Sequence, residues 1–188
     1  MLDALYIPFD GMNEAGLVVG MAAVPPGGME EDPAKETIDS LMVIRKILDQ
    51  AATIEEAVDI IRSYNIDMGS TPIHYLISEK SGRSALIEFS KGEIVVLPNE
   101  YSWQMATNFL MSQTSRSQDI NCGRYRAIEE KLTDLGGKIS PDQAVDLLED
   151  VAQPLTQWSV VYRLSAEEVW VVMGGEYNQI HKIDSGFE

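Results

Sequence analysis

The sequence predicts an α+β fold, and more specifically a four-layer αββα sandwich, with two antiparallel sheets face to face and helices outside. Apolar residues recur with a period of two in two separate blocks of the chain, and each block follows a pair of segments with helical spacing. Several expected strands are apolar on both faces, as strands between two layers are. An α+β fold with a single sheet is the simpler alternative.

The first elements are a buried strand and two helices. Residues 17–24 form an apolar run of strand length that ends at a Pro-Pro-Gly-Gly turn. Over residues 38–48, apolar positions recur at intervals of three and four, which indicates a helix with one buried face. Thr53 and Glu56 then have the spacing of a capping box, which predicts a second helix that extends to about Asn65.

A change to a period of two marks an antiparallel meander. Residues 73–78 and 84–89 flank a Gly-containing connection typical of a hairpin. A Lys-Gly turn leads into a third strand at residues 93–97, and residues 103–107 are expected to form a fourth.

The rest of the chain repeats the order of helices and strands. The polar residues 112–121 are expected to be a mobile loop, and residues 123–135 a charged helix that two glycines stop. Ser140, followed by Pro141 and Gln143, marks the start of another helix. Three further strands are expected at residues 157–163, 168–173 and 178–183.

Composition narrows the classes of protein and partner. The chain has 188 residues, 45% of them hydrophobic, which suits one domain over residues 1–188. Its 14 Lys and Arg against 30 Asp and Glu give a net charge of -16, which opposes binding to nucleic acid. Because no secretory signal and no apolar run of membrane-spanning length is present, we expect no membrane partner and a cytoplasmic location.

One cysteine, Cys122, and two histidines, His74 and His181, limit the chemistry further. They exclude a multi-cysteine zinc site and a His-rich metal site, and we expect no metal or organic cofactor. The nucleophile-elbow, phosphate-loop and Rossmann motifs are absent from the sequence. Both histidines lie in expected strands without a serine motif nearby, so they are interpreted as hydrogen-bonded structural residues.

Three stretches, taken in order, carry a resemblance. They are Asp-Gly-Met-Asn-Glu-Ala-Gly-Leu at 10–17, His-Tyr-Leu-Ile-Ser at 74–78 with Gly82 and Glu88-Phe89, and Ala-Thr-Asn at 106–108 with Gly123-Arg124-Tyr125. In this order they resemble the choloylglycine hydrolase family. That family contains bile salt hydrolases and penicillin V acylases, and it is similar to acyltransferases and ceramidase-type amidases of the wider N-terminal nucleophile (Ntn) superfamily.

The resemblance implies an Ntn-hydrolase type of αββα fold and hydrolysis of a linear, non-peptide amide bond in a small-molecule substrate. In such enzymes a cysteine at the mature N-terminus attacks the amide carbonyl, and water then clears the acyl-enzyme. The α-amine of that cysteine accepts the proton, because an α-amine titrates near neutrality whereas a lysine does not.

The nucleophile is the point at which this sequence departs from the family. The family cysteine is expected several dozen residues before Asp10, whereas this chain begins nine residues before it, and removal of Met1 would expose Leu2. The sequence therefore predicts the C-terminal majority of an amidase, an incomplete domain that is inactive alone. Cys122 is internal, and cleavage before it would sever the two sheet blocks, so it is interpreted as structural.

Two positions match the family's catalytic residues. Asn108 matches the asparagine whose side-chain amide donates to the oxyanion, although an asparagine in a simple turn is the alternative. Arg124 matches the arginine that orients the nucleophile and favours its thiolate, although a solvated arginine in a first helical turn is the alternative. Ala23 replaces a second oxyanion-hole asparagine of the bile salt hydrolases, which argues against bile salts as substrates.

Two other functions remain open. The chain is alternatively a non-catalytic binding or scaffold protein that pairs an exposed sheet edge with a partner chain or with itself, as a homo-oligomer. A third, weaker hypothesis is a two-chain enzyme in which a separate polypeptide supplies the cysteine.

Overall fold

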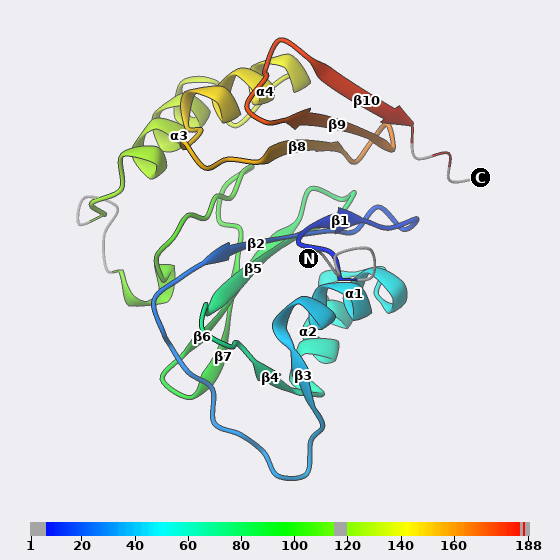
Figure 1. Cartoon of the computed structure of the whole chain (residues 1–188), viewed down its shortest axis with the longest axis vertical. Helices are drawn as coiled ribbons and strands as arrows, with labels where there is room; N and C mark the ends of the chain where they lie inside the picture. The colour runs from blue at the N-terminus through cyan, green and yellow to red at the C-terminus, as the bar shows by residue number, and fades with distance from the viewer. Residues whose placement is uncertain (1–6, 115–119, 185, 187–188) are drawn as a thin grey trace. The chain divides into compact units, whose positions relative to one another are not determined.

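The computed structural model describes residues 7–114, 120–184 and 186, which form two compact units. The first unit comprises the described residues up to Glu100 together with residues 106–121. The second comprises residues 101–105 and the described residues from Cys122 onward. Figure 1 labels the helices and strands of both units.

A five-stranded antiparallel sheet forms the frame of the first unit, with the strand order β1-β2-β5-β6-β7. The strands are Gly11–Met12 (β1), Val18–Ala23 (β2), Ile73–Ser78 (β5), Ser84–Ser90 (β6) and Glu93–Pro98 (β7). Short turns join β5, β6 and β7, which confirms the three consecutive strands predicted over residues 73–97. The single-sheet alternative is wrong, because the second unit has a sheet of its own.

Helices α1 (Ser40–Gln50) and α2 (Ile54–Arg62) cover one face of this sheet (Figure 1). The apolar side of both helices packs against alternate strand residues and forms the main core; its fully buried members include Val43, Ile44, Ile47, Ile61, Val19, Tyr75, Ile77 and Ile87. The Tyr75 hydroxyl donates to the Ser40 carbonyl at 2.6 Å and so joins β5 to the start of α1. Burial, aided by the nearby Asp39 charge, raises the pKa of Tyr75 far above its ordinary value.

Helix α2 begins as predicted but differs in detail. The Thr53 Oγ1 accepts from the Glu56 N–H at 3.2 Å. The carboxylate of Glu56 accepts from the Ala52 N–H at 2.7 Å, one residue before the cap, instead of closing the predicted box on Thr53. The helix ends at Arg62, earlier than predicted, because residues 65–67 form a strand.

A parallel strand pair, β3 (Thr37–Asp39) and β4 (Asn65–Asp67), was not predicted. The buried Asn65 side chain stabilises the acidic loop that precedes β3. Its Nδ2 donates to the carbonyls of Asp32 at 2.8 Å and Lys35 at 3.2 Å, and its Oδ1 accepts from the Asp32 N–H at 2.9 Å. One buried amide therefore holds this loop at Asp32 and Lys35.

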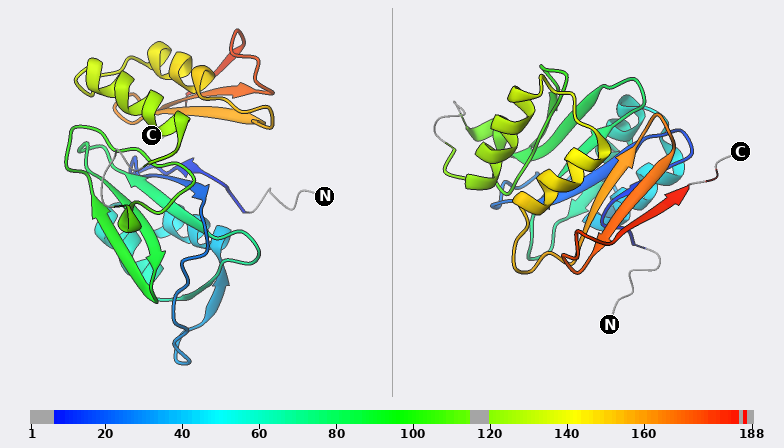
Figure 2. Two further views of the ribbon diagram at one scale, coloured as in Figure 1. Left: turned by 90° about the vertical axis from the view of Figure 1, so that its left-hand side faces the viewer. Right: turned by 90° about the horizontal axis from the view of Figure 1, so that it is seen from above.

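The second unit is a three-stranded antiparallel sheet in the order β10-β9-β8, against which α4 packs (Figure 2). Its strands are Trp158–Arg163 (β8), Glu168–Met173 (β9) and Ile180–Asp184 (β10), close to the predicted ranges. Val145 of α4 packs against Trp170 and Val172 of β9 in a small core. The Lys182 ammonium lies 3.6 Å from the centroid of the Trp170 ring, a cation–π contact.

The helices of the second unit confirm their sequence signals. Helix α3 spans Gly123–Asp134, and Gly136 and Gly137 adopt positive φ angles where it ends. Helix α4 (Pro141–Asp150) starts with a complete capping box, since Ser140 and Gln143 each accept from the other's backbone N–H, at 3.2 and 2.9 Å.

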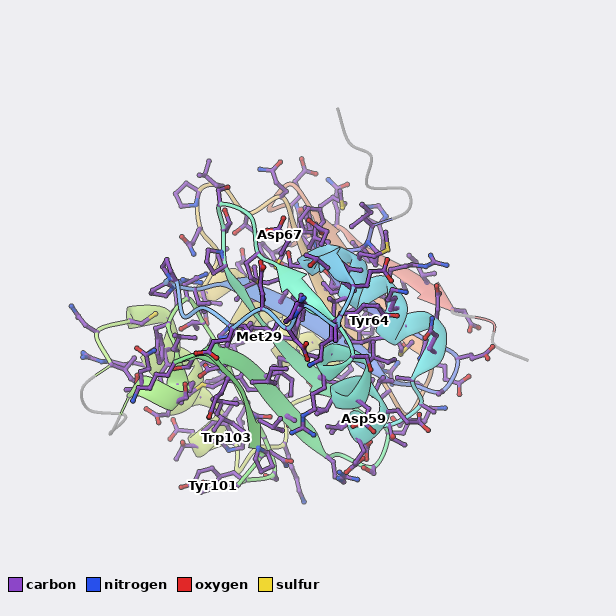
Figure 3. All side chains as sticks on the ribbon, turned by 90° about the horizontal axis from the view of Figure 1, so that it is seen from below. Met29, Asp59, Tyr64, Asp67, Tyr101 and Trp103 are labelled. Atoms are coloured by element: carbon purple, nitrogen blue, oxygen red, sulfur yellow. The ribbon has the colours of Figure 1, made fainter. Side chains whose placement is uncertain are left out.

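The expected fourth strand of the meander is wrong, because residues 103–107, all of which the structure describes, form no strand. Instead, Trp103 lies beside Gly137, just after the end of α3. The rings of Tyr101 and Trp103 stack with centroids 5.5 Å apart (Figure 3). A Cβ at Gly137 would lie 2.5 Å from the Trp103 ring, so this close approach requires glycine. Alternation predicts an extended backbone here but does not supply a neighbouring strand.

Part of the predicted mobile loop is also ordered. Met111–Gln113 form a short 3₁₀ helix, η1, whose last two residues fall within the predicted loop. Residues 115–119 of the predicted loop lie outside the described residues.

Candidate active site

Asn108 lies on an exposed bend beside the edge of the five-stranded sheet. Its Nδ2 donates to the carbonyl oxygen of Ala23, the last residue of β2, at 2.7 Å. Ala23 occupies the position at which the family resemblance implies the second oxyanion donor. The fold therefore brings together the two positions that the resemblance assigns to oxyanion binding.

The Ala23 carbonyl points away from β5. Val24 donates its N–H to the Pro72 carbonyl at 2.8 Å, on the β5 side. In an antiparallel strand, the N–H and C=O of one residue share a side and successive residues alternate, so both groups of Ala23 point to the opposite side. On that side, the neighbour among the described strands is β1, which pairs with Val18 and Val19 alone. Asn108 thus lies at an open stretch of the β2 edge.

A buried carboxylate fastens the segment that carries Asn108 to β6. Glu88 has no exposed surface, and its two oxygens accept from the N–H groups of Met111 at 2.7 Å and Ser112 at 2.8 Å. The His74 Nδ1 lies 3.4 Å from the same carboxylate. Burial alone would raise the pKa of Glu88, but the hydrogen bonds from His74, Ser112 and Met111 outweigh it and hold that pKa below its usual range.

His74, on β5, is fully buried beside Glu88, as expected for a structural histidine. Its Nε2 has no hydrogen-bond partner in the part of the chain that the structure describes. Because a carboxylate faces Nδ1, the Nδ1–H tautomer fits this environment and leaves Nε2 as an acceptor.

Arg124 lies partly buried in the first turn of α3, in the second unit. The side-chain oxygen of Gln153, with the amide oriented to accept, lies 3.0 Å from Nη1 and 3.2 Å from Nη2 and Nε of Arg124. Gln153 follows α4, so this contact joins the start of one helix to the end of the next. No motif in the sequence indicates this contact.

Cys122 is the residue directly before α3 and is partly buried. Its carbonyl accepts from the Arg126 N–H at 3.2 Å. Because Cys122 is internal, its backbone nitrogen is an amide and cannot act as the general base that an N-terminal nucleophile uses.

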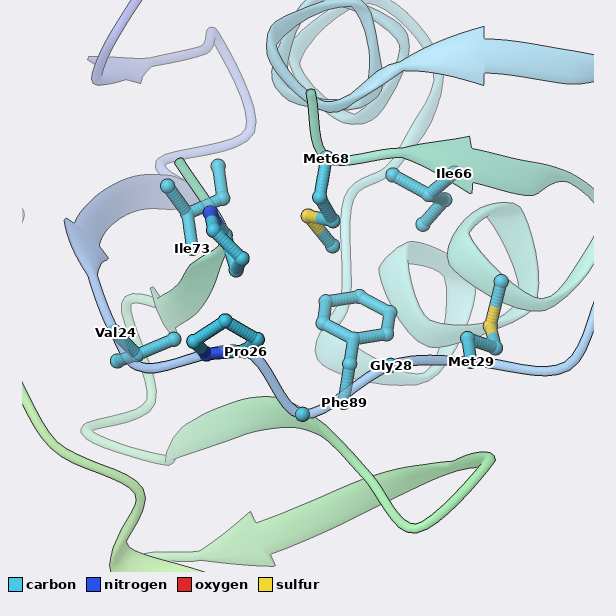
Figure 4. Close-up of a pocket in the computed structure, with 10 residues that line it drawn as sticks. Val24, Pro26, Gly28, Met29, Ile66, Met68, Ile73 and Phe89 are labelled. Carbon is cyan, nitrogen blue, oxygen red and sulfur yellow. The ribbon is translucent and has the colours of Figure 1, made fainter. Parts of the chain in front are cut away.

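A small apolar pocket opens beside the residues that follow β2 (Figure 4). Val24 and Pro26 form one wall, and Met68, Ile73 and Phe89 line the others. Its volume is about 140 Å³, comparable to an apolar cavity of about 150 Å³ that holds one benzene ring.

The described residues contain no group of three or more His, Cys, Asp or Glu side chains that could hold a metal ion. None of the helices in those same residues is long and apolar enough to cross a membrane. The expected cytoplasmic location and absence of nucleic-acid partners stay predictions.

The fold places the chain in a known structural class. It is similar to two structures of conjugated bile acid hydrolase variants from Clostridium perfringens, with TM-scores of 0.75 and 0.71 and 17% sequence identity in each case. Each match covers 100% of this chain, and it covers 76% of the first hydrolase chain and 75% of the second. It is also similar to penicillin V acylase from Agrobacterium tumefaciens, with a TM-score of 0.72 and 20% identity over 93% of this chain and 65% of that one. The predicted α+β fold of the Ntn-hydrolase type is therefore confirmed.

The family is shown by the sequence itself. Residues 8–174 match the family described as acyl-coenzyme A:6-aminopenicillanic acid acyl-transferase, and the chain belongs to that family. This match and the structural neighbours confirm the resemblance to the choloylglycine hydrolases. The chain is therefore related to acylases and amide hydrolases.

Proposed function

We propose that these 188 residues carry the oxyanion-binding and nucleophile-orienting parts of a hydrolase or acyltransferase that acts on linear amide C–N bonds. The observation that carries the proposal is the Asn108 amide at the open edge of β2. A neutral donor held at an exposed strand end can meet the charge that develops on a carbonyl oxygen when a nucleophile attacks it.

Ala23 supplies a second donor without a side chain. Its backbone N–H points to the same side of β2 as its carbonyl, to which Asn108 is bonded. A backbone N–H serves an oxyanion as well as an asparagine amide does. The replacement of asparagine by Ala23 is therefore compatible with acyl transfer.

In the proposed reaction, a thiolate attacks the amide carbonyl carbon and the carbonyl electrons move to the oxygen, which Asn108 and the Ala23 N–H stabilise. Collapse of this intermediate expels the amine, which takes the proton that the nucleophile's α-amine had accepted. Water, or an acceptor amine in a transferase, then cleaves the thioester. The family resemblance assigns to Arg124, which lies in the second unit, the role of favouring the thiolate by its permanent charge.

These residues contain no N-terminal cysteine, and their single thiol, Cys122, is internal. We therefore propose that a chain of these 188 residues alone does not turn over amides. The acyl group and the choice between hydrolysis and transfer depend on substrate contacts. Penicillin V and a conjugated bile acid are suitable probes, because the structural neighbours are named for such substrates.

The test compares this chain with the mature protein from its native source, whose N-terminal residue is read by intact mass. We expect amine release from the probes by a mature protein that begins with cysteine and none by this chain. In the active form, Asn108→Ala should lower kcat by about 10²- to 10³-fold with little change in KM, whereas Asn178→Ala, on an exposed turn, should change neither. Turnover by this chain that Asn108→Ala abolishes would refute its inactivity.

The open β2 edge also favours a second candidate, a binding protein that adds a strand from a partner or another copy. Residues of β2 beyond Val19 have no described strand on their outer side, and unpaired strand edges are templates for pairing. Light scattering over a wide concentration range tests self-pairing, and a strictly monomeric chain would count against it.

A further inference from the structure

Glu88 is a charged residue in an otherwise buried strand. All seven residues of β6 are buried, and Glu88 is the one Asp or Glu in the buried set of the described residues. Removing a carboxylate from water is costly unless its oxygens are hydrogen-bonded, so a residue of this type at this place requires specific partners.

The partners of the Glu88 carboxylate include two backbone N–H groups. Met111 and Ser112 open the 3₁₀ helix η1, and the first N–H groups of a helix have no acceptor within it. Each oxygen of Glu88 takes one of these N–H groups, at 2.7 and 2.8 Å. Hydrogen bonds to an ionised acceptor are about twice as strong as neutral ones.

The same short segment is fixed at its other end by Asn108. Three residues before Met111, the Asn108 amide is bonded to Ala23 on β2, and between them Leu110 is buried. Gln113 adds a bond from its Nε2 to the Ser90 hydroxyl at 3.0 Å. The segment thus spans from β2 to β6, and its attachment to β6 is charge-assisted.

From this arrangement we propose that Glu88 is the positioning residue for Asn108: it fixes η1 to β6 and thereby holds the Asn108 amide at the β2 edge. The functional meaning of this role depends on the proposed oxyanion function of Asn108. Glu88 itself touches no reacting atom. The placement can be measured in the chain as it exists, without any turnover, so a failure here is distinct from a failure of the proposed reaction.

The first measurement uses the unmodified chain. Backbone amide exchange by NMR should show the Met111 and Ser112 N–H groups protected about 10- to 150-fold beyond that of the exposed Glu100, whose N–H donates to no acceptor among the described residues; this is the range expected for a bond to a charged group. Equal exchange at these three amides would overturn the proposal even if every variant failed to fold.

The second measurement uses Glu88→Gln, which keeps the shape but faces an NH₂ group towards one of the two N–H donors. We expect at least one of the Met111 and Ser112 amides to lose its protection, and the side-chain NH₂ signal of Asn108 to move to the position of an unbonded amide. Strand amides of β8 and β9, in the second unit, should be unchanged. The matched control is Glu93→Gln, an exposed carboxylate on the neighbouring strand, which should alter none of these signals. An unshifted Asn108 signal in folded Glu88→Gln would contradict the proposed role.

Discussion

Asn108 and Ala23 are 85 residues apart in sequence, yet the Asn108 Nδ2 donates to the Ala23 carbonyl at 2.7 Å. The bond joins an exposed bend to a strand end, so the donor is held but accessible. Little of the free energy of unfolding should depend on it, since an exposed neutral hydrogen bond contributes about 0.5–1.5 kcal/mol.

Asn108→Ala should therefore lower the free energy of unfolding by no more than about 1.5 kcal/mol. Asn108→Asp, which has the same shape, should cost more, because it replaces the donor by a carboxylate that faces a carbonyl oxygen. Urea denaturation followed by circular dichroism measures both, with Asn178→Ala as the control. An Asp variant as stable as the unmodified chain would mean that the bond is not formed in solution.

The Tyr75 hydroxyl gives a contrasting case, since its bond to the Ser40 carbonyl is buried. Tyr75→Phe removes the donor and leaves that carbonyl without it, so we expect a loss of about 1–3 kcal/mol in the free energy of unfolding. Tyr64→Phe is the matched control, because Tyr64 is partly exposed and its ring, which the Lys46 ammonium approaches at 4.8 Å, is kept. Equal small losses in both variants would argue against a role of the buried bond.

Much of this fold could be predicted because the signals are local. The meander of β5, β6 and β7 follows from alternation and short turns, and the capping box of Ser140 and Gln143 lies within four residues. The parallel pair of β3 and β4 could not be predicted, because each strand has only three residues and the two strands are separated in sequence by two helices. Three residues carry too little alternation to identify a strand.

In the candidate site, too, some features could be predicted from the sequence and others could not. Asn108 and Arg124 could be singled out by family motifs, but the partners that hold them could not. Glu88 was part of a motif without an assigned role, and its burial and its bonds to Met111 and Ser112 depend on tertiary structure. A glutamate within an apolar strand was the one available signal, since such a charge needs a partner when buried.

Two glycines near this site should respond differently to alanine. A Cβ at Gly27 would overlap the Phe89 carbonyl and also lie 3.3 Å from Leu110, which precedes η1. Gly20 lies within β2, and a Cβ there would meet nothing within 4 Å. Gly27→Ala should therefore destabilise by at least about 1–3 kcal/mol, as overpacking does, whereas Gly20→Ala should be neutral or stabilising by up to about 1 kcal/mol. Thermal denaturation of both variants tests this, and a tolerated alanine at position 27 would contradict the close approach.

The buried Glu88 carboxylate should make stability depend on pH in a defined direction. Because hydrogen bonds hold its folded-state pKa below the ordinary value, the unfolded chain binds the proton more readily than the folded chain. The contribution of Glu88 is therefore fully present above the unfolded pKa of about 4.3 and is lost as the pH falls through the lower folded-state value. Unfolding free energies measured from pH 7 to pH 3 should fall more steeply for the unmodified chain than for Glu88→Gln, which cannot titrate at this position. Glu93→Gln, exposed on β7, should keep the steep dependence, and identical slopes for the unmodified chain and Glu88→Gln would show that folding does not lower the pKa of Glu88.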